Sequence, residues 1–133
     1  MQPKNVRAML QNTHSLQATP DTATEQAAAA MNILADFNLA MVGLANFSGM
    51  TPWEWHPEDE LLLVFEGRVS VEILPPEGAS RTHELGPDDV IVVPARHWHR
   101  QHAHVGTRLL FVTSREGNAE SRAVDPRADR GPS

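Results

Sequence analysis

The chain has 133 residues, no cysteine and a formal charge of −6 from 17 acidic and 11 basic residues. This length suffices for one domain with a core of its own, but not for two ordinary domains. The acidic balance argues against nucleic acid or an anionic membrane surface as the main partner, because both need a basic footprint. No apolar run of about 18 residues could span a bilayer. Without cysteine, disulfides, thiol catalysis and thiolate metal sites are excluded.

Residues 1–30 are expected to form an N-terminal extension. Residues 1–20 are polar and irregular, whereas Thr and Asp from Asp21 onward can cap a short alanine-rich helix that reaches Met31. A helix of about two turns is stable only when it packs on the rest of the protein. The N-terminus lacks the layout of a secretory signal, so we expect a cytoplasmic location.

Residues 31–114 have the pattern of an all-β domain. Strands are expected at 33–37, 39–47, 53–56, 60–65, 68–74, 81–85, 90–93, 97–102 and 107–113. The β-branched strand 90–93 is expected to be buried. Short strands at regular spacing, with turns rich in Gly and Pro between them, are typical of a sandwich or barrel.

Residues 115–133 form a polar C-terminal tail in which Val124 is the one branched aliphatic residue. Such a segment buries too little apolar surface to offset the entropy lost on ordering. We expect it to be loose or to lie over a partner.

Two stretches carry the chemistry. Glu54 and His56 are two residues apart, so in a strand their side chains share one face, and Glu60 opens the next strand after a short acidic turn. Two carboxylates and an imidazole could therefore converge. The second stretch, Pro94 to His104, holds four of the seven histidines within eight residues.

The first stretch resembles the first motif of the cupin superfamily. That motif has a His-x-His pair, a Glu four residues after the second His, and a Gly seven residues after the Glu. Here the pattern is Glu54-x-His56, Glu60 and Gly67. Glu54 thus stands where the family usually has its first His.

The second stretch is similar to the second cupin motif, which has a Gly-Asp turn, a strand, a Pro and a His five residues later. Here Asp88-Asp89 stands at the turn, followed by strand 90–93, Pro94 and His99. Arg96 occupies a position where the family usually has Gly, which suggests a somewhat different loop. The resemblance covers residues 38–113 and implies a single double-stranded β-helix, or jelly-roll, barrel.

The resemblance also implies a metal site formed by Glu54, His56, Glu60 and His99 at the barrel mouth. Imidazoles and carboxylates suit a divalent transition metal such as Fe, Mn, Ni, Co or Zn. When two neutral histidines and two carboxylates bind a divalent ion, the net charge of the ion and its ligands together is zero. The ion should therefore be a weaker Lewis acid than an ion held by three histidines and one carboxylate.

Three classes of function fit this pattern. The first is a metal-dependent enzyme that acts on a small organic molecule, as a dioxygenase, isomerase or epimerase, decarboxylase or cyclase. The second is a non-catalytic ligand-binding or sensor protein. The third is a metal-free enzyme in which Glu54 and His56 act as a catalytic acid–base pair. We favour the first class, because a binding protein needs none of the four potential ligands.

The tryptophans of the first stretch predict how the barrel is covered. Trp53 and Trp55 lie on the strand face opposite Glu54 and His56, so both faces of this strand carry groups that need neighbours. Another sheet, residues 1–37 or a second subunit could cover this second face. Cupins often bury such a face in a dimer, so we expect a homodimer.

Overall fold

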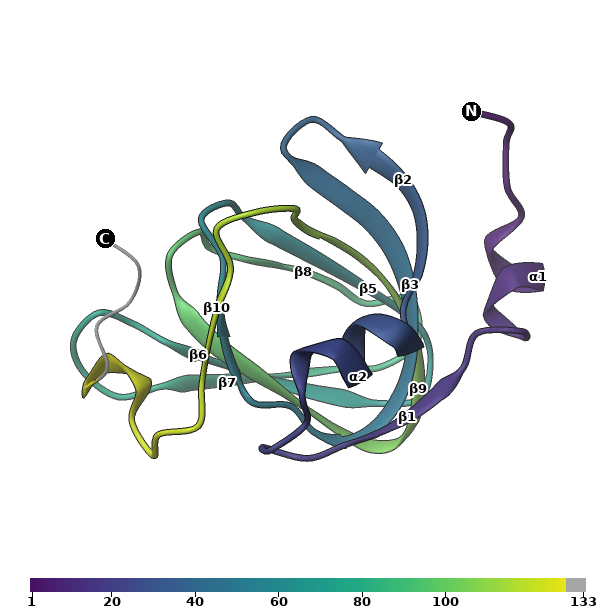
Figure 1. The fold of residues 1–133 in the computed structure, drawn as a ribbon. Helices are drawn as coiled ribbons and strands as arrows, with labels where there is room; N and C mark the ends of the chain where they lie inside the picture. Colours follow the sequence, from purple (N-terminus) through teal and green to yellow (C-terminus); the bar gives the residue numbers. More distant parts are fainter. Residues whose placement is uncertain (129–133) are drawn as a thin grey trace.

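The computed structural model describes residues 1–128. Its elements in chain order are α1 (Val6–Leu10), β1 (Ser15–Ala18), α2 (Thr24–Ala30), β2 (Asn32–Phe37), β3 (Ala40–Met50), β4 (Trp53–Trp55), β5 (Glu60–Glu66), β6 (Val69–Leu74), β7 (Arg81–Leu85), β8 (Val90–Val93), β9 (Trp98–Ser114), β10 (Ala119–Ser121) and the 3₁₀ turn η1 (Pro126–Ala128). The prediction of an all-β barrel is confirmed (Figure 1). Among residues 1–128, no helix has both the length and the apolar character needed to cross a membrane.

Strand β9 pairs with more strands of the barrel than any other described strand does. It pairs antiparallel with β3, β4, β5 and β6, and these strands in turn pair with β1, β2, β10, β8 and β7 (Figure 1). The first half of β9 pairs with β6, and the second half pairs with β5. One strand therefore connects both halves of the barrel and places residues near its start beside the barrel mouth.

The sequence predicted two strands, 97–102 and 107–113, where the structure has the single strand β9. Hydrogen bonds to Arg68 keep the chain extended between the two predicted strands. The N–H of His104 donates to the carbonyl oxygen of Arg68, and the hydroxyl group of Thr107 bonds to both the N–H and the carbonyl of the same residue. These long-range contacts hold the backbone extended where its local sequence, with Gly106, favours a turn.

The interior of the barrel is apolar. As the alternation along β5 predicts, Leu62 and Val64 point inward and are fully buried. The other members of this core are Ala18, Phe47, Val69, Val71, Leu85, Val93, Ala103, Leu109 and Phe111. The expectation of a buried strand at 90–93 is wrong, because Val90 and Val92 are more than half exposed. Strand β8 is buried on one face only, because Val93 is 1% exposed while Val90 and Val92 lie on the solvent side.

The N-terminal extension packs on the barrel. Strand β1 pairs in parallel with β3, in the register Ser15 with Asn46. Helix α2 follows and lies across the front of the barrel in Figure 1. The helix is tied to the C-terminal segment, because the hydroxyl of Thr24 donates to Glu120 and the guanidinium of Arg122 donates to the carbonyl of Thr22.

The C-terminal segment differs from the loose tail that its composition predicts. Residues Ala119–Ser121 form β10, which pairs antiparallel with β4, and Pro126 is buried. Backbone hydrogen bonds to an open strand edge stabilise this segment without apolar side chains, which composition alone does not reveal. Residues 129–133 of the predicted tail lie outside the described residues.

The tryptophan face is covered within the chain. Trp53 is only 4% exposed and packs with Leu74 and Trp98, while Trp55 and Ala119 contact this cluster. Of the three possible covers for this face, other strands of the same chain bury Trp53, so no second subunit is required for it. The homodimer itself stays a prediction.

Candidate metal centre

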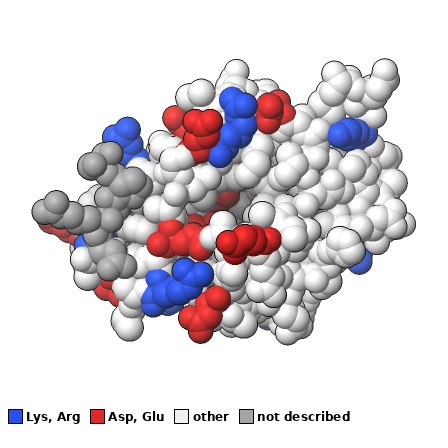
Figure 2. Space-filling view, in the orientation of Figure 1, with Lys and Arg blue, Asp and Glu red and all other residues white. Residues whose placement is uncertain are grey.

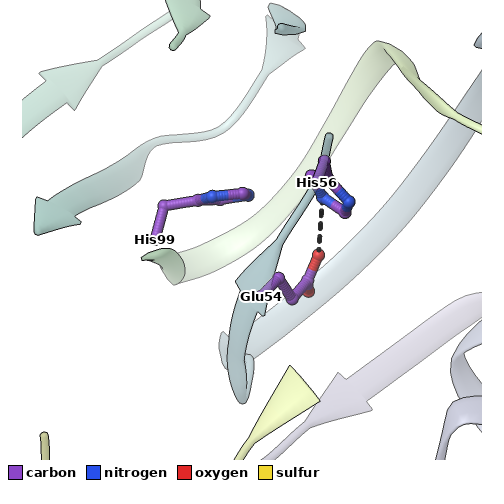
Figure 3. Close-up of side chains that lie close together, drawn as sticks. All are labelled: Glu54, His56 and His99. Atoms are coloured by element: carbon purple, nitrogen blue, oxygen red, sulfur yellow. Dashed lines mark ion pairs between the residues drawn. The ribbon is translucent and has the colours of Figure 1, made fainter. Parts of the chain in front are cut away.

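Strand pairing brings the first two candidate ligands together. Glu54 of β4 lies directly opposite His99 of β9 in the antiparallel register, so their side chains project from the same face of the sheet. His56 follows two residues after Glu54 and turns toward the same point (Figure 3). Glu60 is the first residue of β5 and is buried. All four residues that the motifs predict thus lie in one cluster.

The four side chains are in close contact. The Nε2 atom of His56 lies 3.5 Å from a carboxylate oxygen of Glu54 and 3.6 Å from one of Glu60. The Nε2 atom of His99 lies 3.1 Å from the other oxygen of Glu60. Ligand atoms of Glu54, His56 and His99 all fall within 4.8 Å of one another. These three donors are close enough to bind one ion, and Glu60, which is not part of this group of three, contacts both imidazoles.

A hydrogen bond at Nδ1, the ring nitrogen that points away from the cluster, orients each of the two imidazoles. The Nδ1 atom of His56 lies 2.8 Å from Oδ1 of Asn118, and Nδ1 of His99 lies 3.0 Å from the carbonyl oxygen of His97. Because both partners are acceptors, each Nδ1 carries the hydrogen and donates it. The lone pair needed for a metal then belongs to Nε2, which faces the cluster.

Asn118 is a site residue that sequence reasoning missed. It lies in the polar segment after β9, and its amide nitrogen donates to the carbonyl of Ser114 while its oxygen accepts from His56. Nothing in its local sequence marks it, because it comes close to His56 only once β10 pairs with β4.

The residues present fit a bound cation. The Nε2 atom of His56 is buried and has no hydrogen-bond partner among the described residues. A buried polar atom without a partner is costly, so such atoms usually have a ligand, water or ion beside them. Two carboxylates and a second imidazole surround this atom, which is a donor set that divalent transition metals favour.

Electrostatics within the cluster also favour a positive charge. Burial alone would lower the pKa of His56, but its interaction with Glu54 and the charge of Glu60 raise this pKa to about 9. Burial likewise opposes protonation of His99, yet the hydrogen bond to Glu60 raises the pKa of His99. Burial would raise the pKa of Glu60, but His99 and His56 lower it. Without metal, His56 therefore holds a proton at neutral pH, and a metal ion must displace it.

The other histidines of the second stretch do not join the cluster. The imidazole of His97 bonds to the carbonyl of Ala95. His102 and His104 lie on the face of β9 opposite Gln101 and Ala103, with their ring centroids 4.2 Å apart. His104 also contacts the hydroxyl of Ser70 at 2.6 Å.

A cavity of about 240 Å³ adjoins the cluster. Glu54, His56 and Glu60 line it, and most of its remaining lining is apolar. A concave apolar site with a few polar groups at one end is the usual form of a small-molecule site. Gln101, a second residue that sequence reasoning missed, also lines this cavity.

Comparisons with known proteins agree with this architecture. The family model described as "Cupin domain" matches residues 44–114, slightly more than half of the chain. A search of curated proteins finds no match.

Solved structures with the same fold share little sequence with the chain. A protein from Neisseria meningitidis is 19% identical with a TM-score of 0.62, and the match covers 85% of this chain and 99% of that one. A hydroquinone 1,2-dioxygenase in complex with Cd²⁺ and 4-hydroxybenzonitrile is 18% identical with a TM-score of 0.60, covering 84% and 72%. A cupin-2 domain protein from Shewanella frigidimarina is 20% identical with a TM-score of 0.55, covering 64% and 79%.

Three lines of evidence thus indicate the same family: the two sequence motifs, the barrel built around β9 and the match to the family model. The chain belongs to the cupin family.

Proposed function

We propose that this protein binds a divalent transition metal through Glu54, His56, Glu60 and His99, and acts on a small organic molecule in the adjoining cavity. The observation that carries the proposal is the Nε2 atom of His56. It is buried without a hydrogen-bond partner among residues 1–128, and carboxylate oxygens of Glu54 and Glu60 lie 3.5 and 3.6 Å away.

Each residue of the cluster has a distinct part. A bound Fe, Mn, Co, Ni or Zn ion would supply Lewis acidity, and Fe would also supply reactivity toward O₂. His56 and His99 offer neutral nitrogen donors whose orientation Asn118 and the carbonyl of His97 fix. Glu60 contacts both imidazoles, and the more exposed Glu54 faces the cavity.

The reaction class stays open among oxygenation, isomerisation, decarboxylation and cyclisation. The similar solved structures include a hydroquinone dioxygenase, a DMSP lyase and an oxalate decarboxylase. One barrel therefore serves several chemistries, and the fold does not choose among them.

A second candidate is metal-free acid–base catalysis by Glu54 and His56. Its support is the pKa of His56, which its carboxylate neighbours raise to about 9 despite burial. At neutral pH this imidazole holds a proton that it could donate to a bound molecule, and Glu54 could accept one.

Elemental analysis tests the first proposal against the second. Protein purified without chelator should contain close to one equivalent of transition metal per chain, and His99→Ala should lose it. His102→Ala is the matched control, because His102 lies on the same strand but on its opposite face. If the protein takes up no Fe, Mn, Co, Ni or Zn even on reconstitution, the metal proposal is wrong and the acid–base pair becomes the leading candidate.

A further inference from the structure

Apart from the imidazole of His56, the charged side chains that line the cavity are all carboxylates. Three carboxylates line it, those of Glu54, Glu60 and Glu120, and none of its described lining residues is Lys or Arg. Figure 2 shows this face of the molecule, hollowed near its centre, with acidic side chains in and around the hollow and basic side chains farther out beside them. Glu120 lies directly opposite Glu54 in the pairing of β10 with β4, which places both carboxylates on the same face of the sheet.

A bound divalent metal ion would not make the net charge of the cavity positive. The charge of a divalent ion is cancelled by the carboxylates of Glu54 and Glu60, since the two imidazoles bind in their neutral form. Glu120 is paired with Arg122, whose guanidinium lies 3.7 Å from its carboxylate and which is not among the residues that line the cavity. No positive charge therefore remains to pair with a carboxylate or phosphate group on a bound molecule, and burying an unpaired charge is costly.

The walls of the cavity are apolar and come from two parts of the chain. Leu62, Leu109 and Phe111 contribute from the barrel, and Ala27 and Met31 from the α2 segment. A volume of about 240 Å³ is small for a ligand site. It is nevertheless larger than a cavity of about 150 Å³, which is enough to hold benzene. A molecule of the size of one substituted ring therefore fits.

One polar group of the cavity lacks a partner. Gln101 lines the cavity, and its Oε1 atom is buried with no hydrogen-bond partner in the described part of the chain. This oxygen can accept a hydrogen bond but cannot donate one. A bound hydroxyl group would satisfy it, whereas a carboxylate presents only acceptors.

From these observations we propose that the substrate is a neutral, largely apolar molecule of single-ring size that carries a hydroxyl group, as a simple phenol does. The proposal deepens and rests on the proposed function, because the same cavity and metal centre are involved. Carboxylate and phosphate compounds are excluded as preferred substrates, since no Lys or Arg lines the described cavity. The substrate class therefore also argues against decarboxylation among the reactions left open above.

Calorimetric titration of the Zn²⁺-loaded protein tests the charge preference without requiring turnover. The ligands are p-cresol and the matched pair 4-hydroxybenzamide and 4-hydroxybenzoate, which have the same ring and hydroxyl but differ in charge. We expect p-cresol and the amide to bind at least about ten-fold more tightly than the carboxylate, which corresponds to about 1.4 kcal/mol, because burying an unpaired charge is costly.

Substitution at Met31 tests the cause of that preference. Met31 lines the cavity and is 37% exposed, so a Lys of similar length can replace it and add a cation. We expect Met31→Lys to raise the affinity for 4-hydroxybenzoate about ten-fold, while Met31→Gln, which is neutral and of similar length, leaves it unchanged.

The outcomes separate the two proposals. Zn²⁺-loaded protein that binds 4-hydroxybenzoate as tightly as the amide, or that binds none of the three phenols, overturns the substrate class and leaves the metal centre standing. Protein that takes up none of Fe, Mn, Co, Ni and Zn overturns the proposed function together with the substrate class that rests on it.

Discussion

The Oδ1 atom of Asn118 lies 2.8 Å from Nδ1 of His56, although 62 residues separate the two in the chain. The contact exists because β10, which begins one residue after Asn118, pairs with β4, which ends one residue before His56. A polar C-terminal segment thereby orients an imidazole at the centre of the candidate site.

Removing the amide of Asn118 should weaken metal binding. We expect Asn118→Ala to lower the affinity about 10- to 100-fold, because partners of this kind fix the tautomer and orientation of a ligating imidazole. Competition with a chromophoric chelator measures the change. Asn118→Asp is the control, since its carboxylate can still accept the hydrogen bond and should retain most of the affinity. Equal affinities for the wild type and Asn118→Ala would show that this contact does not tune the site.

Replacing Glu54 by histidine should change which metal is preferred. Glu54→His gives the site a third imidazole and removes one negative charge, so we expect bound metal to be retained with a shift from Mn or Fe toward Ni or Zn. Metal competition followed by elemental analysis measures this ratio. An unchanged metal profile would place Glu54 outside the ligand set.

The stability of the metal-free protein should fall as the pH rises from about 6.5 to about 9. Burial opposes protonation of His56, but Glu54 and Glu60 raise its pKa from 6.5 to about 9 in the folded state. A pKa that is raised on folding contributes stability that is complete below the unfolded value and is lost as the pH passes the folded value.

Urea denaturation in the presence of chelator measures this loss, which we expect to be on the order of 1–3 kcal/mol. Metal binding should strengthen over the same range, since the ion displaces a proton. In His56→Gln the slope should be reduced, while the raised pKa of His99 contributes a remainder of the same sign. A profile of the wild type that is flat between pH 6.5 and 9 would contradict the prediction.

The loop before β9 stores strain at Arg96. Its φ of 61° lies in the left-handed region, and its N–H donates to the carbonyl of His56 at 2.8 Å. The arginine thus occupies a conformation that glycine adopts most easily, at a cost of about 1–3 kcal/mol. Glycine loses about 0.5–1 kcal/mol more conformational entropy on folding. We therefore expect Arg96→Gly to stabilise the protein by about 1 kcal/mol.

Thermal and urea unfolding check this effect, and Arg96→Ala is its control. Alanine removes the same side chain but keeps the steric cost of the left-handed backbone, so it should not stabilise. Equal effects of Gly and Ala would assign the change to the arginine side chain instead of the backbone.

Truncation of Trp53 should destabilise the subunit itself. Trp53 packs against Leu74 and Trp98, and the guanidinium of Arg100 lies 4.2 Å from its ring centroid. We expect Trp53→Ala to cost about 3–5 kcal/mol in the free energy of unfolding. Val124→Ala, at a residue 98% exposed, should change it by less than about 0.5 kcal/mol. A small loss at Trp53, with conversion from dimer to monomer by light scattering, would instead support a subunit interface at this face.

The sequence by itself determined the barrel and the four clustered residues. Strand alternation places Glu54 and His56 on one face, whereas the resemblance to the two cupin motifs is what assigned Glu60 and His99 to the same cluster. The left-handed turn at Gly67, with φ of 92°, follows from the same local chemistry. These features depend on spacing of a few residues, which a sequence displays directly.

Other features of the fold and of the candidate site depend on the tertiary structure alone. The continuity of β9 depends on hydrogen bonds to Arg68, and the roles of Asn118 and Glu120 depend on the pairing of β10 with β4. The burial of Trp53 depends on Leu74 and Trp98 in distant strands. Each of these features joins residues far apart in the chain, and backbone pairing can hold a polar segment whose composition predicts no structure. For that reason the candidate ligands were predictable from the sequence and its family resemblance, whereas the residues that orient them and the chemistry of the cavity were not.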